Sequence, residues 1–188
     1  MPDPLPSTAL LHTELRRTLA NAVLFQLGWF ACVFSASYPA LLGVAVLALL
    51  GHFVLVGSWA REGKLVVSVL LAGSALDTFL LQLGVFDFGE ERRLLPLWLA
   101  LMWALLATTL NHSLAWSAKP WWRASLLGAV GGPAAYYAGS KIADVGLPLG
   151  QTFTLALLAI VWAVVLPLLH GFAQLYEQQY RLRQAQLR

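Results

Sequence analysis

Asp77 has the clearest potential for chemistry, because it is the one charge in a long apolar stretch. An ionised carboxylate near the middle of a bilayer costs about 2.5–3.5 kcal/mol on insertion scales, so it must be buried, paired or protonated. Gly73 and Ser74 precede it by one helical turn, and small side chains there let a neighbouring helix approach closely. The pattern predicts either a carboxyl that exchanges protons or contacts a ligand, or one that fixes helix packing through hydrogen bonds.

A second polar feature is the segment Thr108–Ser113, where polar residues crowd into an apolar stretch. On a helix, Thr108, Asn111 and His112 would share one face, because they are spaced i, i+3, i+4. A histidine gains or loses a proton near neutral pH, so His112 is a candidate acid or base. The alternative is a hydrogen-bond network between helices, with no ligand. For a ligand-binding site, we expect these three residues to line a cytoplasm-facing cavity with Asn21 and Gln26.

Metal and cofactor sites have weaker support in the sequence. His52 and His170 are expected at the same depth as His112, but no histidine pair has a helical ligand spacing such as HxxxH. The single cysteine, Cys32, excludes a cysteine-based zinc site. The chain contains no phosphate-binding GxxxxGK[ST], no GxSxG and no GxGxxG. The sequence therefore predicts no metal and no bound cofactor.

The composition of the whole chain indicates the class of protein in which these residues are positioned. Of 188 residues, 59% are hydrophobic and 11% charged, the mean hydropathy is +0.70 and the net charge is +3. Soluble domains have about 45–50% apolar and about 25% charged residues. These values exclude an ordinary cytosolic enzyme, a disordered chain and a nucleic-acid-binding protein. They predict an integral membrane protein.

Charge-free stretches predict an all-α bundle of six transmembrane helices, since a span needs about 20 mostly apolar residues. The expected helices cover about 19–37, 39–59, 65–86, 94–116, 124–142 and 151–174. No glutamate falls inside any of these ranges. Residues 1–18 then form a cytoplasmic N-terminal segment, residues 19–174 the membrane domain and residues 175–188 a basic cytoplasmic tail that continues the last helix.

Basic residues set the expected orientation. Cytoplasmic loops carry an excess of Lys and Arg. Of the 12 basic residues, one side of the six-span arrangement holds Arg16, Arg17, Arg61, Lys64, Lys119, Arg123, Arg181, Arg183 and Arg188. We therefore expect both termini in the cytoplasm and the loop around Glu90 in the periplasm.

The fifth expected helix carries a pattern of small residues, in which Gly128 and Gly132 form a GxxxG pair followed by Pro133. Such a face is by default a packing surface for another helix. Tyr136 and Tyr137 follow it and are within reach of Asp77. We expect Asp77 to form a network with Tyr137 on the outer side, separate from the cytoplasmic cavity.

Four segments resemble a bacterial family of multi-pass membrane proteins called Domain of Unknown Function 2878. They are Asn21–Cys32 (NAVLFQLGWFAC), Leu76–Phe86 (LDTFLLQLGVF), Leu95–Leu114 (LPLWLALMWALLATTLNHSL) and Gly128–Gly139 (GAVGGPAAYYAG). The resemblance implies a small inner-membrane protein with no established activity. It also implies lipid-modifying enzymes as partners, because family members are encoded near cyclopropane-synthase-like methyltransferases.

The functional hypothesis is a bacterial inner-membrane protein that binds an acyl or isoprenoid lipid or presents it to lipid-modifying enzymes. One alternative is an integral membrane enzyme that uses Asp77 or His112 as acid or base. Another is a small transporter with Asp77 as its proton site. The expected partners are membrane lipid and lipid-modifying enzymes, with no nucleic acid, and the pattern does not fix an oligomeric state.

Overall fold

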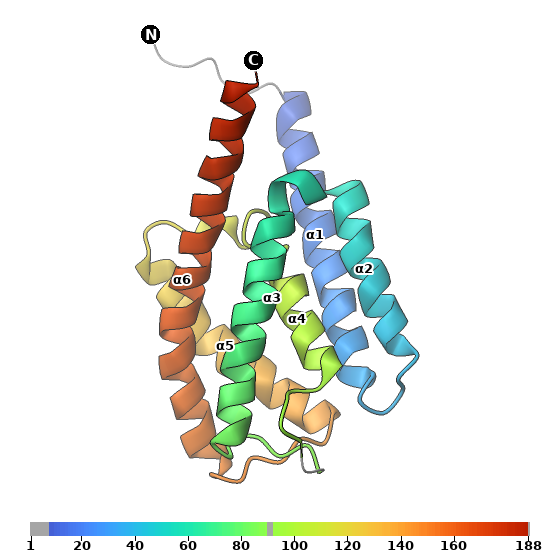
Figure 1. Cartoon of the computed structure of the whole chain (residues 1–188), viewed down its shortest axis with the longest axis vertical. Coiled ribbons are helices and arrows are strands. Elements are labelled where there is room, and N and C mark those ends of the chain that lie inside the picture. The colour runs from blue at the N-terminus through green and yellow to red at the C-terminus, as the bar shows by residue number, and fades with distance from the viewer. Residues whose placement is uncertain (1–7, 90–91, 188) are drawn as a thin grey trace.

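The computed structural model describes residues 8–89 and 92–187, and within them the chain is helical (Figure 1). Its elements, in chain order, are α1 (Thr8–Phe34), α2 (Leu41–Leu55), α3 (Trp59–Gln82), α4 (Leu97–Ala107), the short 3-10 helix η1 (Ala115–Ser117), α5 (Trp122–Ile142) and α6 (Gln151–Gln186). The described residues contain no β-strand, only an isolated bridge between Asp87 and Gly146. The predicted all-α class is confirmed.

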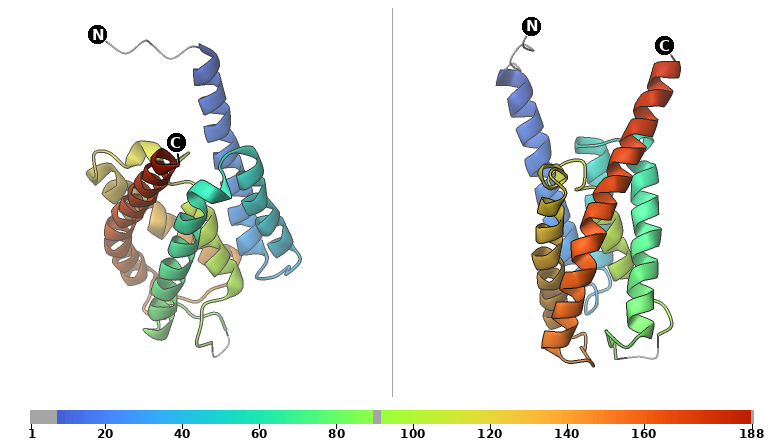
Figure 2. Two further views of the ribbon diagram at one scale, coloured as in Figure 1. Left: turned by 45° about the horizontal axis from the view of Figure 1, so that its top comes forward. Right: turned by 90° about the vertical axis from the view of Figure 1, so that its left-hand side faces the viewer.

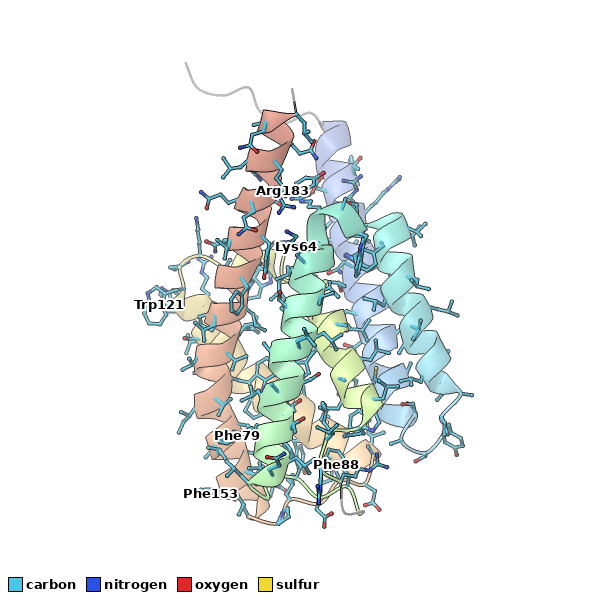
Figure 3. All side chains as sticks on the ribbon, in the orientation of Figure 1. Lys64, Phe79, Phe88, Trp121, Phe153 and Arg183 are labelled. Atoms are coloured by element: carbon cyan, nitrogen blue, oxygen red, sulfur yellow. The ribbon has the colours of Figure 1, made fainter. Side chains whose placement is uncertain are left out.

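The start of α1 and the end of α6 lie at the same end of the bundle, where both extend beyond the turn between α2 and α3 (Figure 2). Lys64 and Arg183 lie toward this end, whereas Phe79, Phe88 and Phe153 lie toward the other (Figure 3). This arrangement fits termini on one side of a membrane.

Three helices are long and apolar enough to cross a membrane, judged by length and composition: α1, α3 and α6. Two other apolar helices are short, since α2 has 15 residues and α4 has 11. At a rise of 1.5 Å per residue, α4 is only about 17 Å long. Six helices are therefore present in the described chain, while six complete spans remain a prediction.

Close contacts through glycines hold the helices together. A Cβ atom on Gly128 or Gly132 of α5 would collide with Trp162 of α6, and one on Gly73 of α3 would collide with the ring of Trp103 on α4. The expected packing face on α5 is thus in contact with α6. Trp103 and Trp162 stack in parallel with their centroids 5.2 Å apart, so the two glycine contacts meet in one core.

The predicted helix at 94–116 is wrong in its second half, because α4 ends at Ala107. The hydroxyls of Thr108 and Thr109 donate to the carbonyls of Leu105 and Leu106, each at 2.6 Å. Hydroxyls that bond to nearby carbonyls compete with regular helix bonding. Beyond Ala107 the backbone forms turns, so the argument that Thr108, Asn111 and His112 share a helix face does not hold.

Other helix boundaries also differ from the predicted ones. α3 begins at Trp59, six residues before the predicted start, and its first turns include the charged residues that were expected in a loop. α1 begins at Thr8, inside the segment predicted to precede the bundle. The expected continuation of the last helix into the tail is present, because α6 runs unbroken to Gln186.

Candidate functional site: a buried histidine–glutamate–histidine cluster

Glu62 joins two histidines in the interior of the bundle. Its Oε2 atom lies 2.7 Å from Nε2 of His52, and its Oε1 atom lies 2.8 Å from Nε2 of His112. The Glu62 side chain is 2% exposed, and the three residues come from α3, α2 and the turns after α4. A buried carboxylate needs partners that offset its lost hydration, and the two imidazoles are those partners.

Asn21 of α1 fixes the opposite side of His52. Its Nδ2 atom lies 3.2 Å from Nδ1 of His52 and donates to the Thr108 carbonyl at 3.1 Å. Its Oδ1 atom accepts from the backbone N–H and the hydroxyl of Ser113, at 3.1 and 2.6 Å. Because a backbone N–H can only donate and a carbonyl can only accept, the amide of Asn21 cannot be flipped.

The fixed amide determines the tautomer of His52. An amide N–H donates to Nδ1, so Nδ1 carries no proton, and the ring proton is on Nε2, which donates to Glu62. Glu62 accepts this bond on one oxygen and shares the other with His112. Asn21 therefore donates to His52, and His52 donates to Glu62, so this series of hydrogen bonds ends on the carboxylate.

His112 is the one member of the cluster that reaches the surface, with 13% of its side chain exposed compared with 1% for His52. Its Nε2 atom is directed at Glu62, so Nδ1 is the ring nitrogen left to exchange a proton with another molecule. A carboxylate that accepts from one nitrogen of an imidazole fixes the orientation of the ring. The arrangement suits general acid–base chemistry at His112.

A metal ion is the other chemistry that these three residues could support. Their ligand atoms lie within 4.8 Å of one another. A histidine that binds metal through Nε2 normally donates its Nδ1 proton to an acceptor. Nδ1 of His52 faces a donor instead, so metal binding through Nε2 would leave Asn21 and His52 without a matched hydrogen bond. The donor pattern therefore favours the hydrogen-bonded cluster over a metal site.

The backbone at Gly57 covers the cluster. A Cβ atom there would lie 2.5 Å from Oε2 of Glu62 and 2.7 Å from Nε2 of His52. Gly57 follows α2 and precedes α3, so the short turn that joins the two helices also covers the buried carboxylate.

Two of the five residues predicted to bind a ligand lie in or beside this cluster. Asn21 and His112 lie in the same cluster, but Thr108 contributes its carbonyl rather than its side chain. Gln26 is exposed, and Asn111 is half-buried; neither side chain makes a hydrogen bond with the residues that the structure describes. Asn21, Asn111 and His112 line neither of the two hollows described below, and a cavity shared by these residues stays a prediction.

Glu62 was missed because it was assigned to a loop among Arg61 and Lys64, where a glutamate is normally solvated. One signal was available in the sequence: Ser58 is a favourable residue to precede a helix. A helix that starts after Ser58, as α3 does, has Glu62 in its first turn. His170, in contrast, lies outside the cluster, and its Nε2 pairs with the Ser117 hydroxyl at 2.9 Å.

Asp77 forms a separate network on α3. Its Oδ2 atom accepts from the indole N–H of Trp103 at 2.7 Å, and its Oδ1 atom accepts from the hydroxyl of Tyr136 at 2.6 Å. The choice of Tyr137 was wrong, because that ring is 37% exposed and lies beside the ammonium group of Lys141. Position 136 faces the core because Gly132, one turn earlier, packs on α6.

A match to a family model places these sites in a wider group of proteins. The model described as "Protein of unknown function (DUF2878)" matches residues 18–168. The chain belongs to the DUF2878 family. No curated protein and no solved structure matches it. The matched stretch of this DUF2878 protein includes the cluster residues and Asp77, but not His170.

Two adjoining apolar hollows lie among the described residues of this DUF2878 protein. The larger, of about 480 Å³, is a cleft between α1 and α5 with its floor at Trp162 and Leu166 of α6. Gln26 and three glycines of α5, Gly128, Gly131 and Gly132, are part of its wall. The smaller, of about 100 Å³, is lined mainly by aromatic rings near Asp77. Both hollows share Phe25, Trp29, Leu106, Ala135 and Trp162.

Proposed function

We propose that this DUF2878 protein is a multi-pass protein of the bacterial cytoplasmic membrane that binds the apolar chain of a membrane lipid in the cleft between α1 and α5. The cleft carries the proposal. Its volume of about 480 Å³ lies within the range of about 300–1,000 Å³ that is typical of ligand sites. Its walls are almost wholly apolar, which suits an acyl or isoprenoid chain and no charged metabolite.

The position of the cleft supports a ligand that enters from the bilayer. α1 and α5 make few contacts with each other, and the hollow between them is lined in part by residues exposed on the outside of the bundle, Gln26, Phe30 and Gly131. Exposed apolar side chains occupy the neighbouring outer surfaces of both helices, among them Leu27 of α1 and Val130 of α5. In a membrane these surfaces contact lipid tails, and a tail can pass into the cleft without crossing water.

Gly131 offers a variant that fills the cleft without disturbing the packing. It lines the cleft, and a Cβ atom there has Leu127 as its nearest neighbour, at 4.0 Å. Gly171 of α6 is the matched control, since a Cβ atom there has no neighbour within 4 Å and the residue lines neither hollow. Gly131→Leu and Gly171→Leu therefore add the same side chain at a site inside the cleft and at one outside it.

Native mass spectrometry of the purified protein tests the proposal. We expect the unaltered protein and Gly171→Leu to retain one co-purifying lipid, and Gly131→Leu to retain at least five times less. Equal lipid retention by both glycine variants would overturn the assignment of the cleft. Failure of all three proteins to retain lipid in mild detergent and in nanodiscs would overturn lipid binding itself.

A second function, an integral membrane enzyme, is favoured by one observation: Glu62 holds His112 in the geometry of an oriented acid or base. On this proposal the lipid is a substrate, and a lipid-modifying enzyme is not needed as a partner. Turnover of the retained lipid by the purified protein, and its absence in His112→Ala, would support the enzyme. Binding with no turnover would leave lipid presentation to partner enzymes as the function.

A further inference from the structure

The aromatic hollow beside Asp77 has a composition that differs from that of the cleft. Its lining includes eight aromatic side chains: Phe25, Trp29, Phe86, Phe88, Trp98, Trp103, Tyr136 and Trp162. Its volume of about 100 Å³ is too small for a whole lipid and fits a compact chemical group. The faces of aromatic rings carry negative electrostatic potential and attract cations.

A buried carboxylate strengthens that potential. Asp77 is fully buried and does not line the hollow, but both rings that hydrogen-bond to it, Trp103 and Tyr136, do. Each ring donates to a different carboxylate oxygen, and these two hydrogen bonds offset part of the cost that burial imposes on the ionised form. When this carboxyl is ionised, its negative charge lies directly behind the aromatic wall.

No cation of the protein neutralises this charge within the described residues, since Asp77 takes part in none of the ion pairs formed there. Arg92, which has an interaction of its own, is exposed. An ionised carboxylate buried without a counter-ion is costly, and a cation in the adjoining hollow would offset that cost.

The lining also selects the type of cation. A primary ammonium carries three N–H groups that each need an acceptor. The side chains that line the hollow carry two hydroxyls, those of Tyr136 and Ser140, which are too few to accept from all three N–H groups. An alkylated ammonium has no such requirement, and aromatic enclosures of this kind suit it.

We propose that the aromatic hollow, backed by the carboxylate of Asp77, is a binding site for a quaternary ammonium group. The site is separate from the lipid cleft in its chemistry, and its test does not depend on whether the cleft binds lipid. The group could belong to a free small cation or to the head of an amphiphile whose chain continues into the cleft.

Choline and its neutral carbon isostere, in which a tert-butyl group replaces the trimethylammonium, are the matched probes. Four of the eight tryptophans in the chain line the hollow, so intrinsic fluorescence reports occupancy. In a neutral maltoside detergent we expect a saturable fluorescence change with choline and at least tenfold weaker binding of the isostere. Equal binding of both probes would overturn the proposal, because shape alone would then explain it.

Variants connect the signal to the site. Asp77→Asn keeps the shape of the side chain and removes its charge, and we expect it to weaken choline binding at least tenfold. Glu14→Gln removes an exposed acidic group on α1 and should leave binding unchanged. If Asp77→Asn does not fold, Trp98→Leu, which removes a half-buried ring from the wall, should weaken binding several-fold. Unchanged binding in the folded Asp77→Asn or Trp98→Leu protein would overturn the assignment.

A dodecyl trimethylammonium probe distinguishes the two sources of the cation. Tighter binding than choline, reduced to the affinity of choline in Gly131→Leu, would assign the site to an amphiphile that also uses the cleft. Binding equal to that of choline, with no effect of Gly131→Leu, would assign it to a free cation. No binding of either cation would overturn the proposal of an ammonium site. It would not contradict lipid binding in the cleft.

Discussion

Asn21 is the residue that determines what the cluster can do. It uses both amide donors and both lone pairs of its oxygen, with partners on α2 and in the turns after α4. Those turns expose backbone groups that a helix would have satisfied, and Asn21 satisfies two of them. The same side chain thus stabilises an irregular segment and fixes the proton position on His52.

Asn21→Asp should convert the cluster into a metal site. The carboxylate still accepts from Ser113 and loses the bond to the Thr108 carbonyl, but it now presents an acceptor to Nδ1 of His52. That nitrogen takes the ring proton, and Nε2 becomes free to bind a cation beside Glu62 and His112. We expect visible absorption from bound Co²⁺ in this variant and at least tenfold weaker Co²⁺ binding in the unaltered protein.

Asn111→Asp is the control, because it adds the same charge to a half-buried position outside the cluster. It should not create the Co²⁺ spectrum. Strong Co²⁺ binding by the unaltered protein at His52 would contradict the tautomer assignment.

At the scale of the helix, Pro167 leaves one backbone carbonyl of α6 without its helical hydrogen bond. A side chain of α5 supplies the missing donor. Proline has no N–H, so the carbonyl of Ala163, four residues earlier, lacks its helical donor. The hydroxyl of Ser125 on α5 donates to this carbonyl at 2.6 Å. The interruption in one helix therefore becomes a contact between two helices.

A double-mutant cycle measures this contact. Ser125→Ala leaves the Ala163 carbonyl without a donor and should reduce stability by about 1 kcal/mol. In a Pro167→Ala background the backbone N–H at position 167 supplies the bond, and the same change should cost about 0.3 kcal/mol or less. Unfolding in detergent provides the values, and equal costs in both backgrounds would show that the hydroxyl does not replace the missing donor.

The tail is attached to α3 by an ion pair. Glu177 accepts from Arg61 at 2.6 Å and from Arg181 at 2.8 Å, while the Arg61 side chain is 41% exposed. Deleting residues 177–188 should reduce stability by about 1 kcal/mol or less, because ion pairs near the surface are screened. Melting in mild detergent should show this loss at low salt and a smaller one at high salt. A truncated protein that does not insert would show that the tail is structural.

For the whole molecule, orientation is the firmest prediction from the sequence. Reporter fusions after Glu90 and after Arg188 test it, although both positions lie outside the described residues. We expect alkaline phosphatase activity at Glu90 and none at Arg188, since nine of the 12 basic residues are expected on the cytoplasmic side. Phosphatase activity at Arg188 would contradict an even number of spans.

The helices could be predicted and the site only in part, for a physical reason. Apolar runs report burial, so the existence of all six helices follows from composition and charge spacing. The end of α4 depends on two threonine hydroxyls that bond to their own backbone, and hydropathy does not register such bonds. Glu62 appeared solvated because its neighbours in sequence are charged, whereas its neighbours in space are His52 and His112.

Gln26 shows the opposite error. A polar residue in an apolar helix was expected to contact other polar side chains, but the side chain of Gln26 lies at the wall of an apolar cleft. Asn21 and Gln26 are five positions apart, which on a helix places them about 140° apart around the axis. Helical geometry alone therefore argued against placing both in one pocket.

The length of α6 has a mechanical consequence. Its 36 residues extend about 54 Å, whereas a hydrocarbon core is about 30 Å thick. The hydrocarbon core can therefore cover little more than half of the helix. The remainder extends beyond it, and Arg61 of α3 forms an ion pair with Glu177 of this helix. Anything joined to the end of α6 would be held roughly 20 Å beyond the hydrocarbon core without a linker, at a distance that the number of helical turns sets.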